Sequence, residues 1–254
     1  MRFMGLAAMA GCVLTITLTR PAHAQTRETE TVNRTVTMPE NGTLRLRNFS
    51  GQVRITAGSG RDVVINAVRR AERSRLDHIK LDISTSGSTV TIEANRRDPN
   101  WNEDKDNVVE TDFQIQVPAA AALDVKVFSS DVTITGVTGR QTLETFSGDI
   151  TVTGAASAVK AKTFDGAIEV DATAAGSNPE IDADTFDGRI RAKVAESAKG
   201  SVAFDSFGGD FNSDLPLSVR TTPGSRRRLT GDLPAGAGKT LRFHTFGGDV
   251  RLTK

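Results

Sequence analysis

The segment that decides the fold reads Thr145-Phe146-Ser147-Gly148-Asp149-Ile150-Thr151-Val152. An alternating strand runs into the phenylalanine, the glycine allows a tight turn, and a second alternating strand follows. From Phe128 onward, the repeated phenylalanines are separated by 18, 18, 22, 21 and 39 residues. Such self-similarity is typical of repeat proteins. Related segments are centred on Phe49, Phe128, Phe164, Phe186, Phe207 and Phe246.

Two short strands and two turns cannot bury an apolar face alone, so the copies are expected to stack. The pattern predicts an all-β fold, a parallel β-helix-like solenoid with repeats of about 18–22 residues. We expect the phenylalanines to form a ladder inside its core, with Thr, Asp and Lys outside. An antiparallel sandwich is the alternative, because short periodic strands also occur there.

The regular repeats occupy residues 121–254, with a long loop or insertion at about 212–244. Residues 25–120 are predicted to form a less regular β-rich part that is continuous with the solenoid. Within that part, residues 69–78 predict a short helix, and Ser86-Gly87-Ser88 predicts a hairpin turn. The charged tail at residues 251–254 is expected to discourage pairing of the last strand with another chain.

Residues 1–24 have the features of a signal peptide. Arg2 precedes an apolar run at residues 3–18, and Ala22-His23-Ala24 offers small residues at a cleavage site. The run is shorter than the ~20 residues that a membrane span needs. We therefore expect export to the periplasm or the cell surface, with no transmembrane segment left after cleavage. A lipid anchor at Cys12 is the alternative, although the apolar run continues well beyond this cysteine.

The composition narrows the functional class. The chain has 32 basic and 31 acidic residues, and removal of residues 1–24 takes away two arginines and the one cysteine. The net charge then becomes −1, which argues against a nucleic-acid binder because such proteins need a basic face. No disulfide can form in the exported chain.

A family resemblance follows from these motifs. The run Thr111-Asp112-Phe113-Gln114-Ile115-Gln116-Val117-Pro118, with the repeats after it, resembles a bacterial family of exported β-strand-repeat proteins. These proteins are commonly described as adhesins and are related to the head domains of autotransporter adhesins. The resemblance covers about residues 30–254 and implies a fold, but no agreed activity or catalytic residues. The chain departs from the pattern at Ser130, where glycine is usual.

The turn aspartates are the most regular polar feature. Stacked carboxylates repel one another unless they are paired, hydrated or bridged by a cation such as calcium. Aspartate also suits turns by bonding nearby backbone, so a structural role is favoured over a cation ladder. The aspartates concerned are Asp131, Asp149, Asp165, Asp187, Asp210 and Asp249.

Two irregular segments are candidate binding loops. Residues 96–107 form a polar loop whose Trp101, Asp104 and Asp106 provide an aromatic platform for a sugar and oxygen side chains. This loop lacks the glycine and the final glutamate of an EF-hand, so we expect no metal there. A basic segment at Arg226, Arg227 and Arg228 could contact acidic polysaccharide, lipid phosphate or a protein. A solvated loop is the alternative in both places.

Catalytic patterns are scarce. His78 and His244 are the two histidines left after cleavage, and no zinc spacing, nucleophile elbow or serine triad occurs. We therefore expect a non-enzymatic envelope or surface module without a cofactor, whose partner is an envelope protein or a glycan. A carbohydrate-active enzyme that uses two carboxylates is the alternative.

Overall fold

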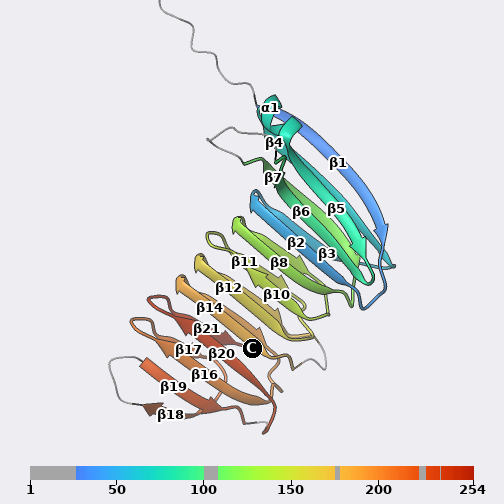
Figure 1. Cartoon of the computed structure of the whole chain (residues 1–254). Coiled ribbons are helices and arrows are strands. Elements are labelled where there is room, and N and C mark those ends of the chain that lie inside the picture. The colour runs from blue at the N-terminus through green and yellow to red at the C-terminus, as the bar shows by residue number, and fades with distance from the viewer. Residues whose placement is uncertain (1–26, 100–107, 175–177, 223–226, 235) are drawn as a thin grey trace, which may run out of the picture.

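The structure is a computed structural model, and it contains two large sheets and one short helix (Figure 1). The strands are stacked along the length of the molecule, from β1 at one end to β18 at the other. The predicted all-β fold class is confirmed. The residues described are 27–99, 108–174, 178–222, 227–234 and 236–254.

One sheet has ten strands. In spatial order these are β1 (Glu28–Thr37), β4 (Asp62–Ala71), β7 (Glu110–Pro118), β3 (Val53–Gly58), β9 (Val132–Thr135), β11 (Ile150–Thr153), β13 (Ile168–Ala172), β15 (Ile190–Val194), β21 (Val250–Thr253) and β17 (Phe211–Ser213).

The other sheet has eleven strands. In spatial order these are β18 (Ser218–Thr222), β19 (Arg227–Asp232), β16 (Gly200–Ser206), β20 (Lys239–Thr245), β14 (Ile181–Asp187), β12 (Val159–Asp165), β10 (Gln141–Glu144), β8 (Ala122–Ser129), β2 (Thr43–Ser50), β6 (Thr89–Arg97) and β5 (Ile79–Ser86).

Each repeat gives one strand to each sheet, and the Phe-containing turn joins the two. Neighbouring repeats pair in parallel and in register, so that Ile150 lies beside Ile168 and Ile168 lies beside Ile190. Antiparallel pairing is confined to the two ends of the stack, where it involves β1, β4, β5, β18 and β19. Both sheets are therefore mixed, and identical turn residues lie above one another through the middle of the molecule.

The order of the repeats in space differs from their order in the chain. Strand β20 lies between β14 and β16, and β21 lies between β15 and β17. The C-terminal repeat is therefore inserted between two earlier ones, and the last strand of the chain is paired on both sides. In the same way, β2 and β3 stack directly on β8 and β9. The β18–β19 hairpin, which lies between β17 and β20 in the chain, accounts for the 39-residue gap between the last two repeated phenylalanines.

The core lies between the two sheets and follows the alternation within each strand. In β12, Val159, Ala161 and Thr163 point inward and are buried, whereas Lys160 and Lys162 point outward. Most of the buried apolar side chains of all repeats join in one cluster. Many of these inward residues are Val, Ile or Ala, and larger Leu and Phe side chains fill the rest of the space between the two sheets.

The N-terminal predictions are confirmed in part. Helix α1 spans Arg73–His78, so it begins later than predicted, because residues 69–71 are the end of β4. Leu76 of this helix is buried in a small second cluster with Ala71, Ile79 and Val109. The predicted hairpin is present, since Gly87 and Ser88 connect β5 to β6.

The prediction that the repeated phenylalanines fill the core is wrong. Their side chains lie on the outer face of the eleven-strand sheet and are 41–54% exposed. The alternation of the strand gives the reason. Thr163 takes the inward place at the end of β12, so Phe164 must point outward.

Candidate binding surface

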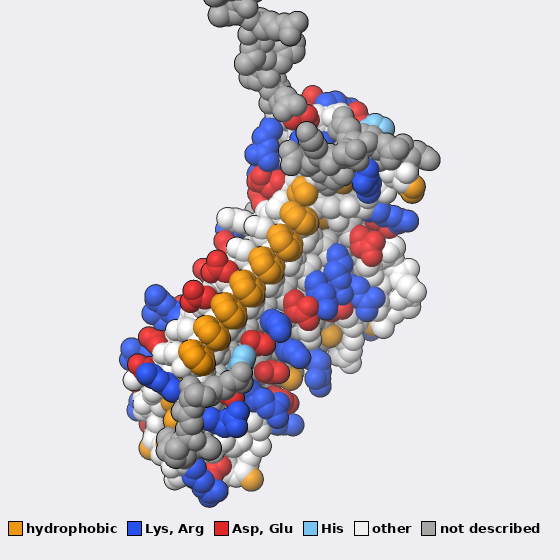
Figure 2. All heavy atoms as spheres, turned by 60° about the vertical axis from the view of Figure 1, so that its left-hand side comes forward, with side chains coloured by type: hydrophobic (Ala, Val, Ile, Leu, Met, Phe, Trp, Pro, Cys, Tyr) orange, Lys and Arg blue, Asp and Glu red, His pale blue; other side chains and the backbone are white. Residues whose placement is uncertain are grey.

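Seven phenylalanines form one continuous exposed stripe across the repeats, hereafter the phenylalanine stripe (Figure 2). Successive ring centroids lie 4.7–5.0 Å apart, and the angles between ring planes are 1–17°. The stripe is therefore about 29 Å long. In spatial order its members are Phe49, Phe128, Phe146, Phe164, Phe186, Phe246 and Phe207.

Parallel in-register pairing places these rings at the strand spacing, so each ring stacks on its neighbours. The ring faces are covered in this way, and the ring edges face the solvent. With about 200 Å² for a whole phenylalanine side chain, the stripe exposes roughly 600 Å² of apolar surface. A contiguous patch of this size is at the top of the range for the largest patch of a monomeric protein, and such patches are often functional.

A column of buried hydroxyl groups lies beneath the stripe and fixes the backbone that carries it. The Oγ1 atoms of Thr145, Thr163 and Thr185 each donate to a carbonyl oxygen of the preceding repeat at 3.2 Å. Because each hydrogen bond joins two repeats beside a ring, the rings are held at a constant spacing. The buried polar residues that directly precede a stripe phenylalanine are Asn48, Thr145, Thr163, Thr185, Ser206 and Thr245.

The turn glycines allow two repeats to approach each other closely. A Cβ at Gly148 would lie 2.3 Å from the carbonyl oxygen of Ser130, and one at Gly188 would lie 1.9 Å from that of Gly166. Gly148 also has a positive φ of 145°. Ser130, which stands in place of a glycine, is buried, and its Oγ has no hydrogen-bond partner.

The aspartates three residues after a stripe phenylalanine tie one turn to the next. Asp131 Oδ1 accepts from the backbone N–H of Asp149 at 3.0 Å, and Asp149 Oδ1 accepts from Ala167 N–H at 2.7 Å. Asp249 repeats this contact with the N–H of Asp210 at 2.9 Å. Among the described residues, no group of three or more His, Cys, Asp or Glu could hold a metal ion. The contacts support the structural interpretation of these aspartates.

Asp165 and Asp187 differ from the other turn aspartates. Asp165 directly follows Phe164, and it pairs in register with Asp187 one repeat further on. Both side chains are exposed, and neither has an ion-pair partner among the described residues. Two like charges therefore lie beside the middle of the stripe, and Arg189, two residues after Asp187, forms no ion pair with either of them in the described part of the chain. Figure 2 shows acidic side chains along this side of the stripe. We call this side the turn border, and its aspartates are Asp131, Asp149, Asp165, Asp187, Asp210 and Asp249.

On the opposite side of the stripe, which we call the strand border, acidic and basic side chains pair with one another. Lys126 pairs with Glu144 at 2.9 Å, and Asp184 pairs with Lys162 at 3.2 Å and with His244 Nδ1 at 3.1 Å. Partial burial acts to raise the pKa of Asp184, but the hydrogen bonds from His244 and Lys162 outweigh it and lower this pKa. The border consists of Arg47, Lys126, Glu144, Lys162, Asp184, His244 and Asp205.

A groove of about 340 Å³ runs between the strand border and one end of the stripe. Its apolar wall consists of Phe164, Phe186, Phe246 and Phe207. The groove extends the apolar surface sideways, so a ligand on the stripe can also contact the strand border.

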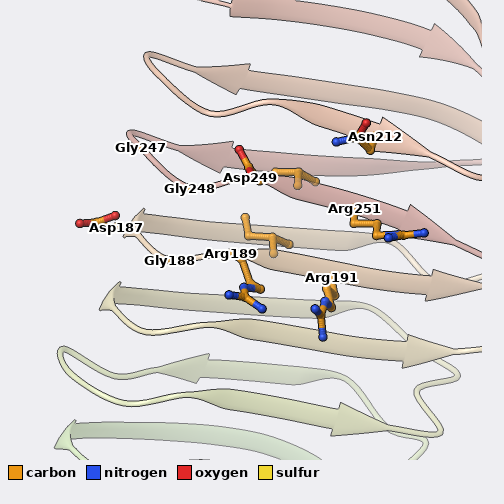
Figure 3. A pocket seen from close by; sticks show the side chains of 11 residues that line it. Asp187, Gly188, Arg189, Arg191, Asn212, Gly247, Gly248, Asp249 and Arg251 are labelled. Atoms are coloured by element: carbon orange, nitrogen blue, oxygen red, sulfur yellow. The ribbon is translucent and has the colours of Figure 1, made fainter.

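A second hollow, of about 470 Å³, lies across the turns of β15 and β21 (Figure 3). Arg189, Arg191 and Arg251 point outward from these strands, with Asp187 and Asp249 at the turns. Two of the arginines have partners, because Arg191 bonds Glu169 at 3.1 Å and Arg251 lies 3.5 Å from Asp214.

Of the six residues predicted as binding sites from sequence, two lie in the described part of the chain. Trp101, Asp104, Asp106 and Arg226 lie outside the described residues. Arg227 and Arg228 are on β19, at the end of the stack. Arg228 pairs with Asp205 of the strand border at 2.9 Å, and Arg227 pairs with Asp210.

Sequence reasoning found the phenylalanines but gave them the wrong side. The alternation in β8 carried the missing signal, because Leu123, Val125 and Val127 occupy the buried positions and leave Phe128 outside. The repeated hydroxyl residue before the phenylalanine gave the same indication.

No curated protein matches the sequence. Three solved structures are similar to this chain over most of their length. A candidate cell adhesion protein from Clostridium sporogenes is 10% identical, with 89% of this chain and 99% of that chain covered and a TM-score of 0.48. A candidate adhesin from Bacteroides fragilis is 11% identical (88% and 96% covered, TM-score 0.36), and a candidate lipid-binding protein from Parabacteroides distasonis is 9% identical (89% and 97% covered, TM-score 0.24). Such distant similarity carries no functional argument.

The family comparison covers nearly all of the described chain. The model of the family described as Toastrack DUF4097 matches residues 35–253, which include every stripe phenylalanine. This match confirms the resemblance to a β-strand-repeat family without an agreed activity. The chain belongs to the Toastrack DUF4097 family.

Proposed function

We propose that this protein is a non-enzymatic binding module of the cell envelope, exported by residues 1–24, which holds a partner on the phenylalanine stripe. The stacked repeats act as a rigid support, and we class them as a parallel β-helix-like solenoid. The observation that carries the proposal is the stripe itself, with seven exposed rings in an unbroken row. So much contiguous exposed apolar surface is unusual on a folded protein, which favours a role in binding.

The support beneath the stripe is suited to binding rather than to chemistry. In-register strand pairing and the buried threonine hydroxyls hold the rings in one row. A ligand would meet a preformed surface, which reduces the entropy lost on binding. In the described part of the chain, no helix is long and apolar enough to cross a membrane.

Three carboxyl groups with a shifted pKa are unsuited to act as the general acid of a glycosidase. A glycosidase needs one carboxyl group with a raised pKa to act as the general acid. Asp112, Asp124 and Asp184 each have a shifted pKa. In each of the three, burial acts to raise the pKa, but hydrogen bonds from basic side chains outweigh this effect and the pKa is lowered. All three are therefore ionised at neutral pH.

The experiment compares the purified protein with the double variant Phe164→Ser with Phe186→Ser, hereafter the stripe variant. Retention on isolated bacterial envelope fragments is measured by co-sedimentation. We expect the stripe variant to bind at least about tenfold more weakly, which corresponds to ~1.4 kcal/mol. Val219→Ser, at an exposed apolar residue on β18, is the control and should bind like the wild type.

Equal retention of the stripe variant and the wild type would overturn the proposal. Release of reducing ends from a panel of polysaccharides by the wild-type protein would overturn its non-enzymatic part. Cell fractionation tests export separately: deletion of residues 1–24 should leave the protein in the cytoplasm, and an unchanged distribution would contradict the assignment of a signal peptide.

A further inference from the structure

The stripe offers ring edges, and this limits the ligands that it can hold. Sugar rings bind aromatic side chains by lying against a ring face. Here each inner ring has both faces covered by neighbours at 4.7–5.0 Å. The exposed edges are hydrocarbon, so they suit apolar side chains better than a glycan.

The charges beside the stripe limit the ligand further. The turn border carries six aspartates and two described cations, Arg189 beside Asp187 and Arg227, which pairs with Asp210 at one end of the stripe. Asp165 and Asp187 have no cation of their own, whereas the strand border pairs its charges internally. The field over the stripe is therefore acidic. Such a field repels an anionic lipid surface and attracts a cationic partner.

A second copy of this chain fits these charges less well. If two stripes met face to face in opposite directions, the acidic turn borders would oppose each other. If they met in the same direction, each turn border would face a strand border whose cations are already paired. Neither arrangement supplies a cation to Asp165 and Asp187.

The dimensions of the stripe match a helix. At 1.5 Å per residue, a stripe of about 29 Å accommodates an α-helix of about 19 residues. The apolar positions of such a helix recur about every 5.4 Å, close to the spacing of the rings. Cations at the edge of its apolar face would reach the turn border, as in other complexes in which a helix occupies a groove.

We propose that the phenylalanine stripe binds a basic amphipathic helix of a partner polypeptide. Its apolar face lies on the rings, and its Lys or Arg side chains lie beside Asp165 and Asp187. This inference rests on the proposed function and names the class of partner.

The test uses synthetic labelled peptides and the purified protein, with fluorescence anisotropy as the readout. The probe is a 20-residue helix of leucine and lysine with a continuous leucine face, about the length of the stripe. A matched helix with glutamate in place of lysine tests the charge, and a scrambled leucine–lysine peptide tests the apolar face. We expect the leucine–lysine helix to bind and the two controls to bind at least about tenfold more weakly.

Two double variants locate the binding site. The stripe variant should lose about tenfold or more in affinity for the leucine–lysine helix. Asp165→Asn with Asp187→Asn should lose about three- to tenfold and show a weaker salt dependence, because two exposed charge pairs are removed. Asp182→Asn lies on β14 away from the stripe and should bind like the wild type.

The outcomes separate this inference from the proposed function. Loss of envelope binding in the stripe variant, without binding of the leucine–lysine helix by the wild type, would overturn the partner class and leave the proposed function intact. Peptide binding that is the same in the stripe variant would overturn the inference. So would stripe-dependent binding to anionic phosphatidylglycerol vesicles, or a dimer in sedimentation velocity that the stripe variant abolishes, with no peptide binding in either case.

Discussion

In several repeats, a buried hydroxyl residue and the stripe phenylalanine that follows it point to opposite faces of the sheet. Thr163 points inward and donates to the carbonyl oxygen of Gly148 at 3.2 Å, while Phe164 points outward and stacks on the next ring. A hydroxyl in a core and an aromatic ring in solvent reverse the usual preference of both residues. The hydroxyl is satisfied by the backbone of the preceding repeat, and the rings partly shield one another.

The first prediction concerns the stability that a stripe ring provides. Phe164→Ala removes two stacking contacts from a half-exposed ring, so we expect a loss of about 1–2 kcal/mol in the free energy of unfolding. Leu143→Ala, at a fully buried position on β10, should cost about 2–5 kcal/mol. Urea denaturation of both variants checks the difference. A Phe164→Ala loss as large as that of Leu143→Ala would place the ring in the core after all.

The second prediction concerns the turn glycine. Gly148→Ala places a Cβ 2.3 Å from the Ser130 carbonyl oxygen at a positive φ, so we expect a loss of roughly 2–4 kcal/mol. Gly60→Ala, where a Cβ would meet open space, should be nearly neutral. Thermal unfolding of the two variants tests this. Equal melting temperatures would show that neighbouring turns do not approach so closely.

For the strands and turns, the periodicity of the sequence was sufficient to predict where in the chain they lie. It was not used correctly to predict which face of the sheet the phenylalanines occupy, and it could not predict the order of the repeats in space. The Phe-x-Gly motif located the turns that join the two sheets, and Ser86-Gly87-Ser88 located a hairpin. The outward side of Phe128 could have been inferred from the buried positions in β8. The position of the β20–β21 repeat between two earlier repeats could not have been inferred, because no local feature of the sequence shows which repeats become neighbours in space.

The inserted repeat leads to the third prediction. Strands β20 and β21 connect β14 and β15 to the last pair of strands, β16 and β17. A chain ending at residue 233 should therefore lose amide protection in β16 and β17, while β12 and β13 remain protected. Hydrogen exchange measured by mass spectrometry gives the answer for each segment. A chain that lacks only residues 253–254 is the control, and unchanged protection of β16 in the chain ending at residue 233 would contradict the insertion.

At the scale of the whole molecule, charged side chains on the outer faces connect neighbouring strands. Asp124 on β8 accepts from Arg47 at 2.9 Å and from Arg45 at 3.1 Å, both on β2. Asp112 on β7 accepts from Arg70 on β4 at 2.6 Å. These pairs connect β4 to β7, and they connect β2 to β8, the first strand of the regular repeats. Strands β2 and β8 are neighbours in the sheet although β3 to β7 lie between them in the chain.

The pairs lead to the fourth prediction, on acid stability. Burial acts to raise the pKa of Asp124, but the hydrogen bonds from Arg47 and Arg45 outweigh it and lower this pKa. Because the folded-state pKa lies below the unfolded value of ~3.9, ionised Asp124 stabilises the folded protein above about pH 4. This contribution is lost as the pH falls through the lowered pKa. Urea unfolding at pH 7, 5 and 3 should show a smaller loss between pH 5 and pH 3 for Asp124→Asn than for the wild type. An equal loss in both proteins would contradict this role.

The central claim is that the exposed phenylalanine stripe is a binding surface held by a stable solenoid. Its most direct test is the envelope co-sedimentation of the stripe variant beside the wild type, with circular dichroism to show that both are folded. We expect the folded stripe variant to bind at least about tenfold more weakly than the wild type. A folded stripe variant that is retained as well as the wild type would contradict it.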